Sequence, residues 1–215
     1  MALHHFIPTQ FHNVLGTRNP VLRVSDGDTV VTTTLDAGGR DQTNNERAPK
    51  PNPMTGPFFV KGAEPGDALI VQIQRMTPTR STGWTYSSLA ANVVEPEILP
   101  QLPERERVDW AIDPEAGTVR LVDPPIAVAD LVLPLRPMIG CFGVAPGMDQ
   151  AISTTTSGRH GGNMDFRGFE PGAVACFPVY EPGALFFLGD GHACQGDGEI
   201  VGTGIETSFE IEFTV

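Results

Sequence analysis

Phe209-Glu210-Ile211-Glu212-Phe213-Thr214-Val215 is a stretch in which apolar and polar side chains alternate without interruption. In an extended strand successive side chains point to opposite faces, so Phe209, Ile211 and Phe213 share one face and the two glutamates share the other. A period of two therefore predicts a half-buried strand, with its apolar face on a core and its polar face toward solvent.

Other short apolar runs bounded by turn residues lie upstream of this stretch, and they too are typical of strands. The chain also contains 24 Gly and 20 Pro, which disfavour helix interiors by about 1 and 3 kcal/mol each. We expect a mainly β protein of packed sheets, sandwich-like or barrel-like, with minor α content. The predicted strands cover Pro20–Val24, Thr29–Leu35, Phe58–Val60, Ala68–Ile73, Val119–Val122, Ile126–Pro137, Val174–Val179 and Ala184–Leu188.

Two segments fit this pattern less well. Trp84–Val94 is compatible with a short helix or a covering loop, and Leu99–Gly117 is predicted to be a polar, Pro-punctuated excursion. From Ile139 onward the chain becomes richer in glycine. At 215 residues the chain is expected to form a single domain (1–215), with two tightly packed β lobes at about 1–137 and 138–215 as the alternative.

Charge and cysteine usage narrow the class of partner. The net charge of −12 disfavours nucleic acid and anionic membranes, because both present negative phosphates. Three widely spaced cysteines cannot form a complete disulfide framework and lack a zinc-binding Cys-x-x-Cys spacing. No signal peptide or apolar run of about 20 residues is evident, so we expect a cytoplasmic protein with a small-molecule substrate.

The densest group of chemically useful residues is Gly189-Asp190-Gly191-His192-Ala193-Cys194-Gln195-Gly196-Asp197-Gly198-Glu199. Asp190 and His192 lie two apart, so on an extended strand their side chains project from the same face. A carboxylate with an imidazole is a common ligand pair for zinc or a similar divalent ion. A Gly/Asp-rich hairpin with one incidental histidine is the alternative.

A second candidate is Arg159-His160-Gly161-Gly162-Asn163-Met164-Asp165. Paired glycines before an amide and a carboxylate form the kind of turn that can direct backbone N–H groups at an oxyanion. Asp165 is suited to bind a metal or to orient a histidine. Alternatively, Asn163 and Asp165 cap the turn through local hydrogen bonds.

Two further acids stand at strand positions. Asp36 follows the predicted strand Thr29–Leu35, and Glu206 lies in the strand-like run Gly204–Thr207. An ionised carboxylate in apolar surroundings is costly unless it is paired or coordinated. Taken singly, each fits a solvated surface acid better than a site residue.

Five stretches, taken together and in order, resemble the acetamidase/formamidase family. They are Asn52-Pro53-Met54-Thr55-Gly56-Pro57, Gly62-Ala63-Glu64-Pro65-Gly66-Asp67, Gly143-Val144-Ala145-Pro146, Gly161-Gly162-Asn163-Met164-Asp165, and the stretch from Gly189 to Glu199. With their flanks they span most of the chain from about residue 20 to residue 207. The chain is shorter than typical members, and the difference falls between about Thr77 and Pro137.

The resemblance implies packed β-sheets, commonly assembled as a homodimer or higher homo-oligomer. It implies hydrolysis of a short linear amide, such as formamide or acetamide, to a carboxylate and ammonia. A divalent metal is also implied, with zinc favoured and calcium or manganese as alternatives. Carried onto this sequence, the metal ligands are Asp36, Asp190, His192 and Glu206, and the catalytic residues are Asn163, Asp165 and His192.

Three other hypotheses stay open. Cys194 shares strand parity with Asp190 and His192, so a covalent Cys–His route is conceivable. A relative with this fold that binds a metal or small ligand without turnover is a second possibility. The third is an enzyme that cleaves a different linear or cyclic C–N substrate at the same site.

Overall fold

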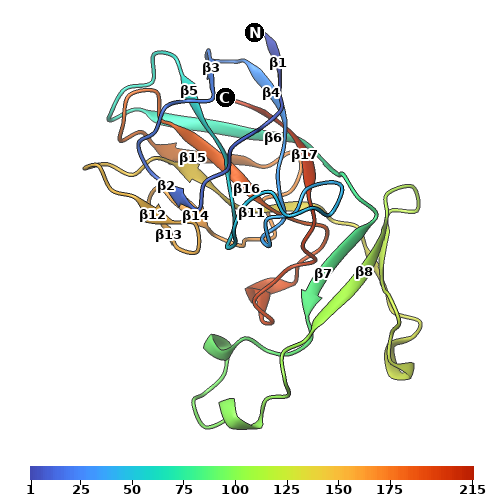
Figure 1. Cartoon of the computed structure of the whole chain (residues 1–215). Helices are drawn as coiled ribbons and strands as arrows, with labels where there is room; N and C mark the ends of the chain where they lie inside the picture. The colour runs from blue at the N-terminus through green and yellow to red at the C-terminus, as the bar shows by residue number, and fades with distance from the viewer.

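The alternating stretch forms strand β17 (Phe209–Thr214), which lies at the centre of a five-stranded sheet (Figure 1). Its odd-numbered side chains are buried, while Glu210 and Glu212 face outward and pair with Arg75 on the neighbouring strand. The period of two therefore predicted both the strand and its buried face. In sheet order the five strands are β1 (Leu3–Phe6), β4 (Thr29–Thr33), β17, β6 (Ala68–Pro78) and β15 (Val174–Pro178).

A six-stranded sheet faces the first. Its central strand β16 (Phe186–His192) is buried at every residue, because its two faces and both its edges are covered. The glycine-rich β14 joins this sheet by pairing with β11 and β13. In sheet order the strands are β13 (Ser157–Gly158), β14 (Gly161–Asn163), β11 (Met138–Val144), β16, β5 (Thr55–Val60) and β3 (Leu22–Val24).

Aromatic side chains fill the space between the two sheets. The Phe213 ring of β17 lies 5.3 Å from the Phe58 ring of β5 and 5.2 Å from the Phe186 ring of β16, measured between centroids. All three residues are fully buried. The Phe213–Phe58 pair is edge-to-face and the Phe213–Phe186 pair is tilted, and edge-to-face packing is one of the arrangements that aromatic rings prefer. The main core thus lies between the sheets, which confirms the predicted packed-sheet architecture.

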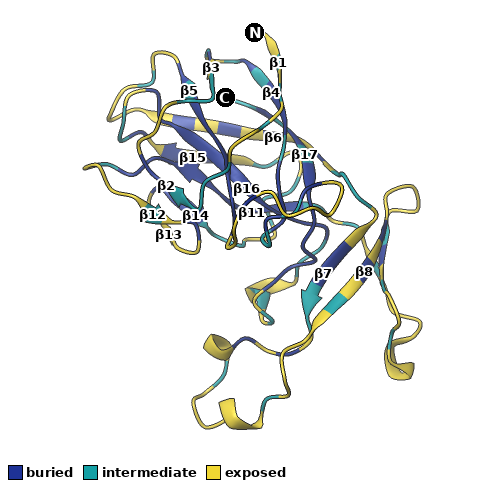
Figure 2. Cartoon of the chain, in the orientation of Figure 1, coloured by how far each residue is buried: buried dark blue, intermediate teal, exposed yellow.

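A smaller four-stranded sheet extends away from this body (Figure 1). In sheet order it contains β10 (Val132–Pro134), β9 (Thr118–Leu121), β8 (Arg107–Asp113) and β7 (Thr82–Tyr86). Figure 2 shows that the connections beyond β7 and β8 are mostly exposed. Two short strands, β2 (Val14–Leu15) and β12 (Ile152–Ser153), pair separately.

Two sequence-based predictions were wrong in this region. Leu99–Gly117 was predicted to be a polar, Pro-punctuated excursion, yet it contains β8, whose Trp110 and Ile112 are buried while charged residues on the strand face solvent. Ile126–Pro137 was predicted to be a strand, but it begins with a 3-10 turn and only Val132–Pro134 is extended. Its apolar side chains are largely exposed, so they do not mark a core-facing strand.

The helical content consists of short 3-10 turns. They cover Ala91–Val93 (η1), Leu99–Gln101 (η2), Ile126–Val128 (η3) and Asp197–Glu199 (η4). The segment Trp84–Val94 therefore holds the end of a strand and one 3-10 turn. None of these turns has the length or the apolarity to cross a membrane.

Both large sheets combine strands from either side of residue 137. Strand β17 lies between β4 and β6, and β16 lies between β11 and β5. The segments 1–137 and 138–215 are thus interleaved in shared sheets. The structure describes all residues from 1 to 215 and is a computed structural model.

Candidate metal centre

The end of strand β16 carries Asp190 and His192 into the interior. Asp190 has a left-handed φ of 57°, so the strand is not regularly extended at this point. Its neighbour β11 places residue 141 opposite Gly189 and residue 139 opposite Gly191, which leaves Gly140 beside Asp190. Both side chains still meet, with His192 Nε2 lying 3.5 Å from Asp190 Oδ1.

Glu206 approaches the same histidine from the segment before β17. An isolated antiparallel bridge aligns its backbone with His192, and a second aligns it with Trp84. Glu206 Oε1 lies 3.0 Å from His192 Nε2, and the two side chains are 2% and 0% exposed. The pairing of distant segments therefore creates a contact that sequence spacing does not show.

Two more acids complete a group that we call the carboxylate–histidine cluster: Asp165, Asp190, His192, Glu199 and Glu206. In one set, ligand atoms of Asp165, Asp190 and His192 lie within 4.8 Å of one another. In the other set, the same holds for His192, Glu199 and Glu206. His192 belongs to both sets, so its imidazole is at the centre of the cluster.

Four ligand atoms of the cluster are buried and make no hydrogen bond of good geometry: Asp165 Oδ1, Asp190 Oδ1, Glu206 Oε2 and His192 Nε2, the last lying 3.0 Å from Glu206 Oε1. Buried polar atoms are nearly always satisfied, and leaving several together in one place is costly. Carboxylate oxygens with one imidazole nitrogen are a donor set that a divalent cation accepts. The residues present therefore fit a metal ion.

The remaining carboxylate oxygens of two cluster members are fixed by amide side chains. Asn52 Nδ2 donates to Asp190 Oδ2 at 2.9 Å and to Asn163 Oδ1 at 2.7 Å. Asn163 Nδ2 in turn donates to Asp165 Oδ2 at 2.5 Å. These bonds orient both carboxylates and leave one oxygen of each free for a ligand.

Two glycines make room for the cluster. A Cβ atom on Gly140 would lie 2.5 Å from Asp165 Oδ1 and 3.1 Å from Asp190 Oδ2. One on Gly204 would lie 2.4 Å from His192 Cγ. Neither position admits a side chain unless the cluster moves, which accounts for these glycines within otherwise strand-like runs.

Burial and mutual repulsion shift the pKa values of the acids in the cluster. Burial raises the pKa of Asp165 to about 8, and the Asp190 carboxylate adds to the rise. Burial also raises the pKa of Glu206 to about 8, against the opposing influence of His192. Burial lowers the pKa of His192, but the carboxylates of Glu206 and Asp190 outweigh it and hold that pKa well above its usual value. Without a cation the cluster therefore retains protons that a metal would displace.

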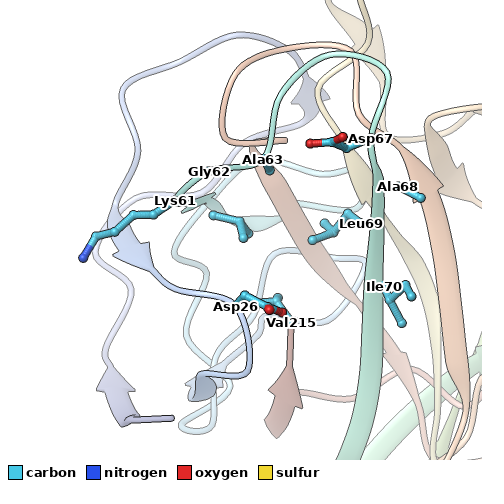
Figure 3. A pocket seen from close by; sticks show the side chains of 10 residues that line it. Asp26, Lys61, Gly62, Ala63, Asp67, Ala68, Leu69, Ile70 and Val215 are labelled. Atoms are coloured by element: carbon cyan, nitrogen blue, oxygen red, sulfur yellow. The ribbon is translucent and has the colours of Figure 1, made fainter.

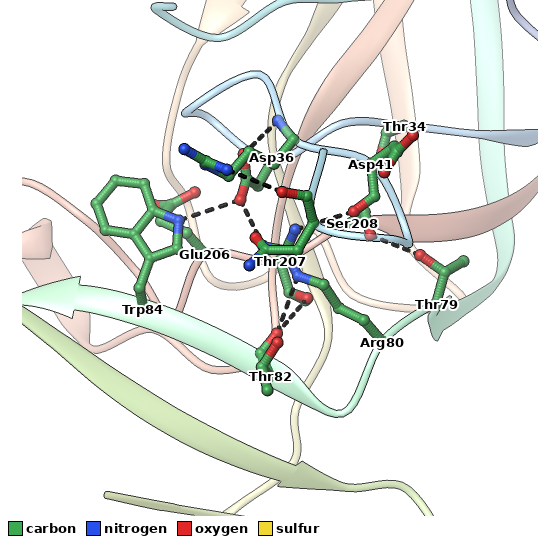
Figure 4. Close-up of polar contacts among 12 residues, drawn as sticks. Thr34, Asp36, Asp41, Thr79, Arg80, Thr82, Trp84, Glu206, Thr207 and Ser208 are labelled. Carbon is green, nitrogen blue, oxygen red and sulfur yellow. Dashed lines mark hydrogen bonds and ion pairs between the residues drawn. The ribbon is translucent and has the colours of Figure 1, made fainter. Parts of the chain in front are cut away.

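Asp36 lies outside this cluster, although the family resemblance implied that it is a ligand. Figure 4 shows its carboxylate between Arg80, which forms an ion pair with it, and the Trp84 indole, whose Nε1 donates to it at 3.1 Å. The backbone N–H of Arg40 donates to its other oxygen at 2.8 Å. Its oxygens are thus occupied by cationic and N–H partners.

The expected oxyanion hole at Gly161–Asn163 also differs from the structure. These residues form β14, which pairs with β11 on one edge and β13 on the other. The N–H of Asn163 donates to the Thr156 carbonyl at 3.1 Å. The segment contributes the side chain of Asn163 to the site, and Asp165 follows two residues later, while the N–H of Asn163 is used in the sheet.

Three residues of the site were quoted within motifs but given no role by sequence reasoning: Asn52, Gln195 and Glu199. The site was predicted from neighbouring residues of the same motifs. The contacts of these three residues form only when segments far apart in the sequence come together. Cys194 is half-buried, and burial raises the pKa of its thiol. Because the thiolate is the nucleophile, this surrounding disfavours the covalent route.

Other concave regions differ in chemistry from the cluster. The pocket in Figure 3, of about 420 Å³, lies between the turn before β6 and the Val215 terminus. Its ionisable side chains are Asp26, Lys61 and Asp67, and it has no histidine. A smaller pocket of about 270 Å³ lies beside Trp84, the residue whose backbone pairs with Glu206.

Comparison with known proteins places this chain in a family. The sequence model of the acetamidase/formamidase family matches residues 9–151 and 148–215. An acetamidase from Mycolicibacterium smegmatis is 29% identical over 227 residues, covering 76% of this chain and 53% of the relative. A formamidase from Methylophilus methylotrophus is 26% identical over 193 residues, covering 68% of this chain and 46% of the relative.

Solved structures show the same likeness. A predicted acetamidase/formamidase from Thermoanaerobacter tengcongensis superposes with a TM-score of 0.82 at 29% identity, covering 99% of this chain and 68% of that one. This chain spans about half the length of the curated relatives that it matches. The family match, the shared fold and the motif order agree, and the chain belongs to the acetamidase/formamidase family.

Proposed function

We propose that this chain hydrolyses the C–N bond of a short linear amide, such as formamide or acetamide, releasing ammonia and a carboxylate. The reaction would take place at a divalent metal held by Asp190, His192 and Glu206, with Asp165 beside them. The observation that carries the proposal is the convergence of four buried atoms that could bind a metal and that make no hydrogen bond of good geometry. The acetamidase and formamidase named among the relatives support the substrate class.

Zinc is the metal that we favour. One imidazole and two or three carboxylates can supply three protein ligands and leave a position for substrate or water, which is the usual pattern of catalytic zinc sites. Manganese and calcium accept the same oxygen donors, and calcium prefers more of them. Asp36 is left out of the ligand set because Arg80 and Trp84 occupy its oxygens.

A bound divalent cation would supply Lewis acidity, lowering the pKa of water toward about 7 and polarising an amide carbonyl. The protein's own contribution is to fix the orientation of the groups around the reaction site. Asn52 and Asn163 fix the carboxylates of Asp190 and Asp165 through the hydrogen bonds described above. Burial of the cluster excludes bulk solvent, which strengthens electrostatic interactions with developing charge.

Proton transfer to the departing nitrogen is assigned to Asp165 and Glu199. The raised pKa of Asp165, about 8, suits a group that gives and takes protons near neutral pH. Glu199 Oε1 lies 4.0 Å from His192 Nε2, and its side chain is 18% exposed, whereas His192 is sealed from solvent. Glu199 is therefore placed to exchange protons between the buried cluster and water.

Ammonia release tests the proposal. The purified protein is assayed with formamide, acetamide and larger amides as isolated, after chelation and after addition of zinc, manganese or calcium. We expect release that chelation abolishes and one metal restores. Alkylation of Cys194 should leave the activity in place, because the mechanism uses no thiol.

The main competing function is binding of a metal or small ligand without turnover, and the shorter middle of the chain, between about Thr77 and Pro137, is the sequence feature that favours it. Metal binding with no ammonia release under any metal loading would favour it. Release that persists after complete metal removal would contradict the metal-dependent mechanism. Release only from a cyclic or larger amide would retain the mechanism and change the substrate.

The raised acid pKa values predict a pH-dependent stability of the metal-free protein. Asp165 has a pKa near 8 when folded and 3.8 as its reference value, so between these values the folded state binds more protons than the unfolded chain. Stability then falls as pH rises. We expect the melting temperature of chelated protein to decrease from pH 5 to pH 8, as measured by calorimetry.

The isosteric variant Asp165→Asn is the control for this prediction, because it cannot ionise. It should show a shallower decrease over the same pH range, and bound metal should oppose the decrease in the unmodified protein. Equal slopes for the variant and the unmodified protein would show that Asp165 does not retain its proton when folded.

Assembly and location remain predictions. We propose a homodimer or higher homo-oligomer, supported by the exposed apolar side chains of Val93, Ile98, Leu99 and Ile126 on the connections of the smaller sheet. Light scattering during size-exclusion chromatography tests it. A cytoplasmic location is the accompanying proposal.

A further inference from the structure

Gln195 connects two segments of the site, and none of the roles assigned so far uses it. Its Oε1 lies 2.7 Å from His192 Nδ1, three residues before it in the sequence. Its Nε2 donates to the backbone carbonyl of Asp165 at 2.6 Å, across a separation of 30 residues. One half-buried amide therefore contacts both the central histidine and the segment that carries Asp165.

The orientation of this amide follows from its partner on the Asp165 side. A backbone carbonyl oxygen only accepts hydrogen bonds, so the NH₂ end of Gln195 must face it. The amide oxygen must then face His192, and an oxygen without a hydrogen only accepts. His192 Nδ1 is consequently the donor in the 2.7 Å contact and carries the hydrogen.

This assignment determines what the other ring nitrogen can do. With the hydrogen on Nδ1, Nε2 is the ring nitrogen that would present a lone pair to a metal when the ring is neutral. That atom makes no hydrogen bond of good geometry, and it lies 3.0 Å from Glu206 Oε1 and 3.5 Å from Asp190 Oδ1. In the neutral ring the Nε2 lone pair would thus be directed at a cation shared with these carboxylates.

We propose that Gln195 is a positioning residue that fixes His192 in the Nδ1–H tautomer and directs Nε2 to a divalent cation. Through its bond to the Asp165 carbonyl, it also sets the distance between the two sides of the cluster. The inference rests on the proposed metal-dependent function. Hydrogen-bond partners of metal-binding histidines commonly change metal affinity by about 10–100-fold when they are removed.

Zinc affinity, measured by competition with a chromogenic chelator, tests this role separately from activity. We expect Gln195→Leu to weaken zinc binding about 10–100-fold while retaining one zinc per chain at saturation. The control is Gln74→Leu, because Gln74 is exposed on β6 and bonds only to Gln72 and Thr214. Circular dichroism of both metal-free variants establishes that they are folded.

Nitrogen-15 spectra of the imidazole give a readout that a purely structural role would not move. In the zinc-loaded protein, we expect His192 to show a protonated Nδ1 and a metal-bound Nε2. Zinc on Nδ1, or unchanged affinity in Gln195→Leu, would overturn the inference while leaving the proposed metal site in place. If the unmodified protein binds no zinc, manganese or calcium, the proposed function fails first, and the inference fails with it.

Discussion

Replacing His192 with Ala is expected to remove the bound metal and to lower amide hydrolysis by roughly 10³-fold or more. Lewis-acid stabilisation is worth several kcal/mol, and each 1.4 kcal/mol corresponds to about a factor of ten in rate. His192 belongs to both ligand sets of the cluster, so its loss leaves only carboxylates. Metal content by mass spectrometry and ammonia release measure the two effects.

The fold is expected to survive this substitution, because the sheets are held by the core between β16 and β17. His160→Ala is the matched control, since His160 is also buried but lies at the β13–β14 turn. It should retain the metal content of the unmodified protein. Full amidase activity in His192→Ala without bound metal would refute the proposed mechanism.

Replacing Arg80 with Met is expected to destabilise the protein by about 3–5 kcal/mol, the usual cost of removing one partner from a buried ion pair. Arg80 is 6% exposed and Asp36 is fully buried, so the substitution leaves an unpaired carboxylate in the interior. Arg80 also donates to the carbonyls of Asp41 and Thr82, both at 3.1 Å. Urea unfolding measures the loss against a typical total of about 5–15 kcal/mol.

Arg75→Met provides the comparison, because Arg75 pairs with Glu210 and Glu212 on an exposed surface. Exposed pairs contribute about 0–1 kcal/mol, so this change should be small. Adding Asp36→Asn to Arg80→Met should recover part of the lost stability by removing the unpaired charge. Equal effects of the two arginine substitutions would contradict the view that Asp36 is held by an ion pair rather than by a metal.

The sheets could be predicted because their signal is local. In β17 the alternation of Phe209, Ile211 and Phe213 identifies the buried face without reference to any partner. β8 has the same period of two in Trp110 and Ile112, but the prolines and charged residues around it led to its prediction as a polar excursion. Which strands pair is a non-local property, so the interleaving of the two halves was not visible in the sequence.

The site likewise has features that are local in the sequence and features that depend on the fold. Asp190 and His192 were grouped because they lie two residues apart, and their side chains do meet, although the left-handed conformation of Asp190 replaces the regular strand that was assumed. Asp36 offered no local sign that Arg80, 44 residues later, would pair with it. Gln195 and Glu199 were present in the quoted motif, but their roles depend on distances that only the folded chain supplies.

Anomalous X-ray diffraction from zinc-loaded crystals, collected on both sides of the zinc absorption edge, tests the central claim most directly. The account predicts one anomalous peak about 2.0–2.2 Å from His192 Nε2, with oxygen atoms of Asp190 and Glu206 at similar distances. A cluster without a peak in a crystal of active enzyme, or a peak at Asp36 instead, would contradict it.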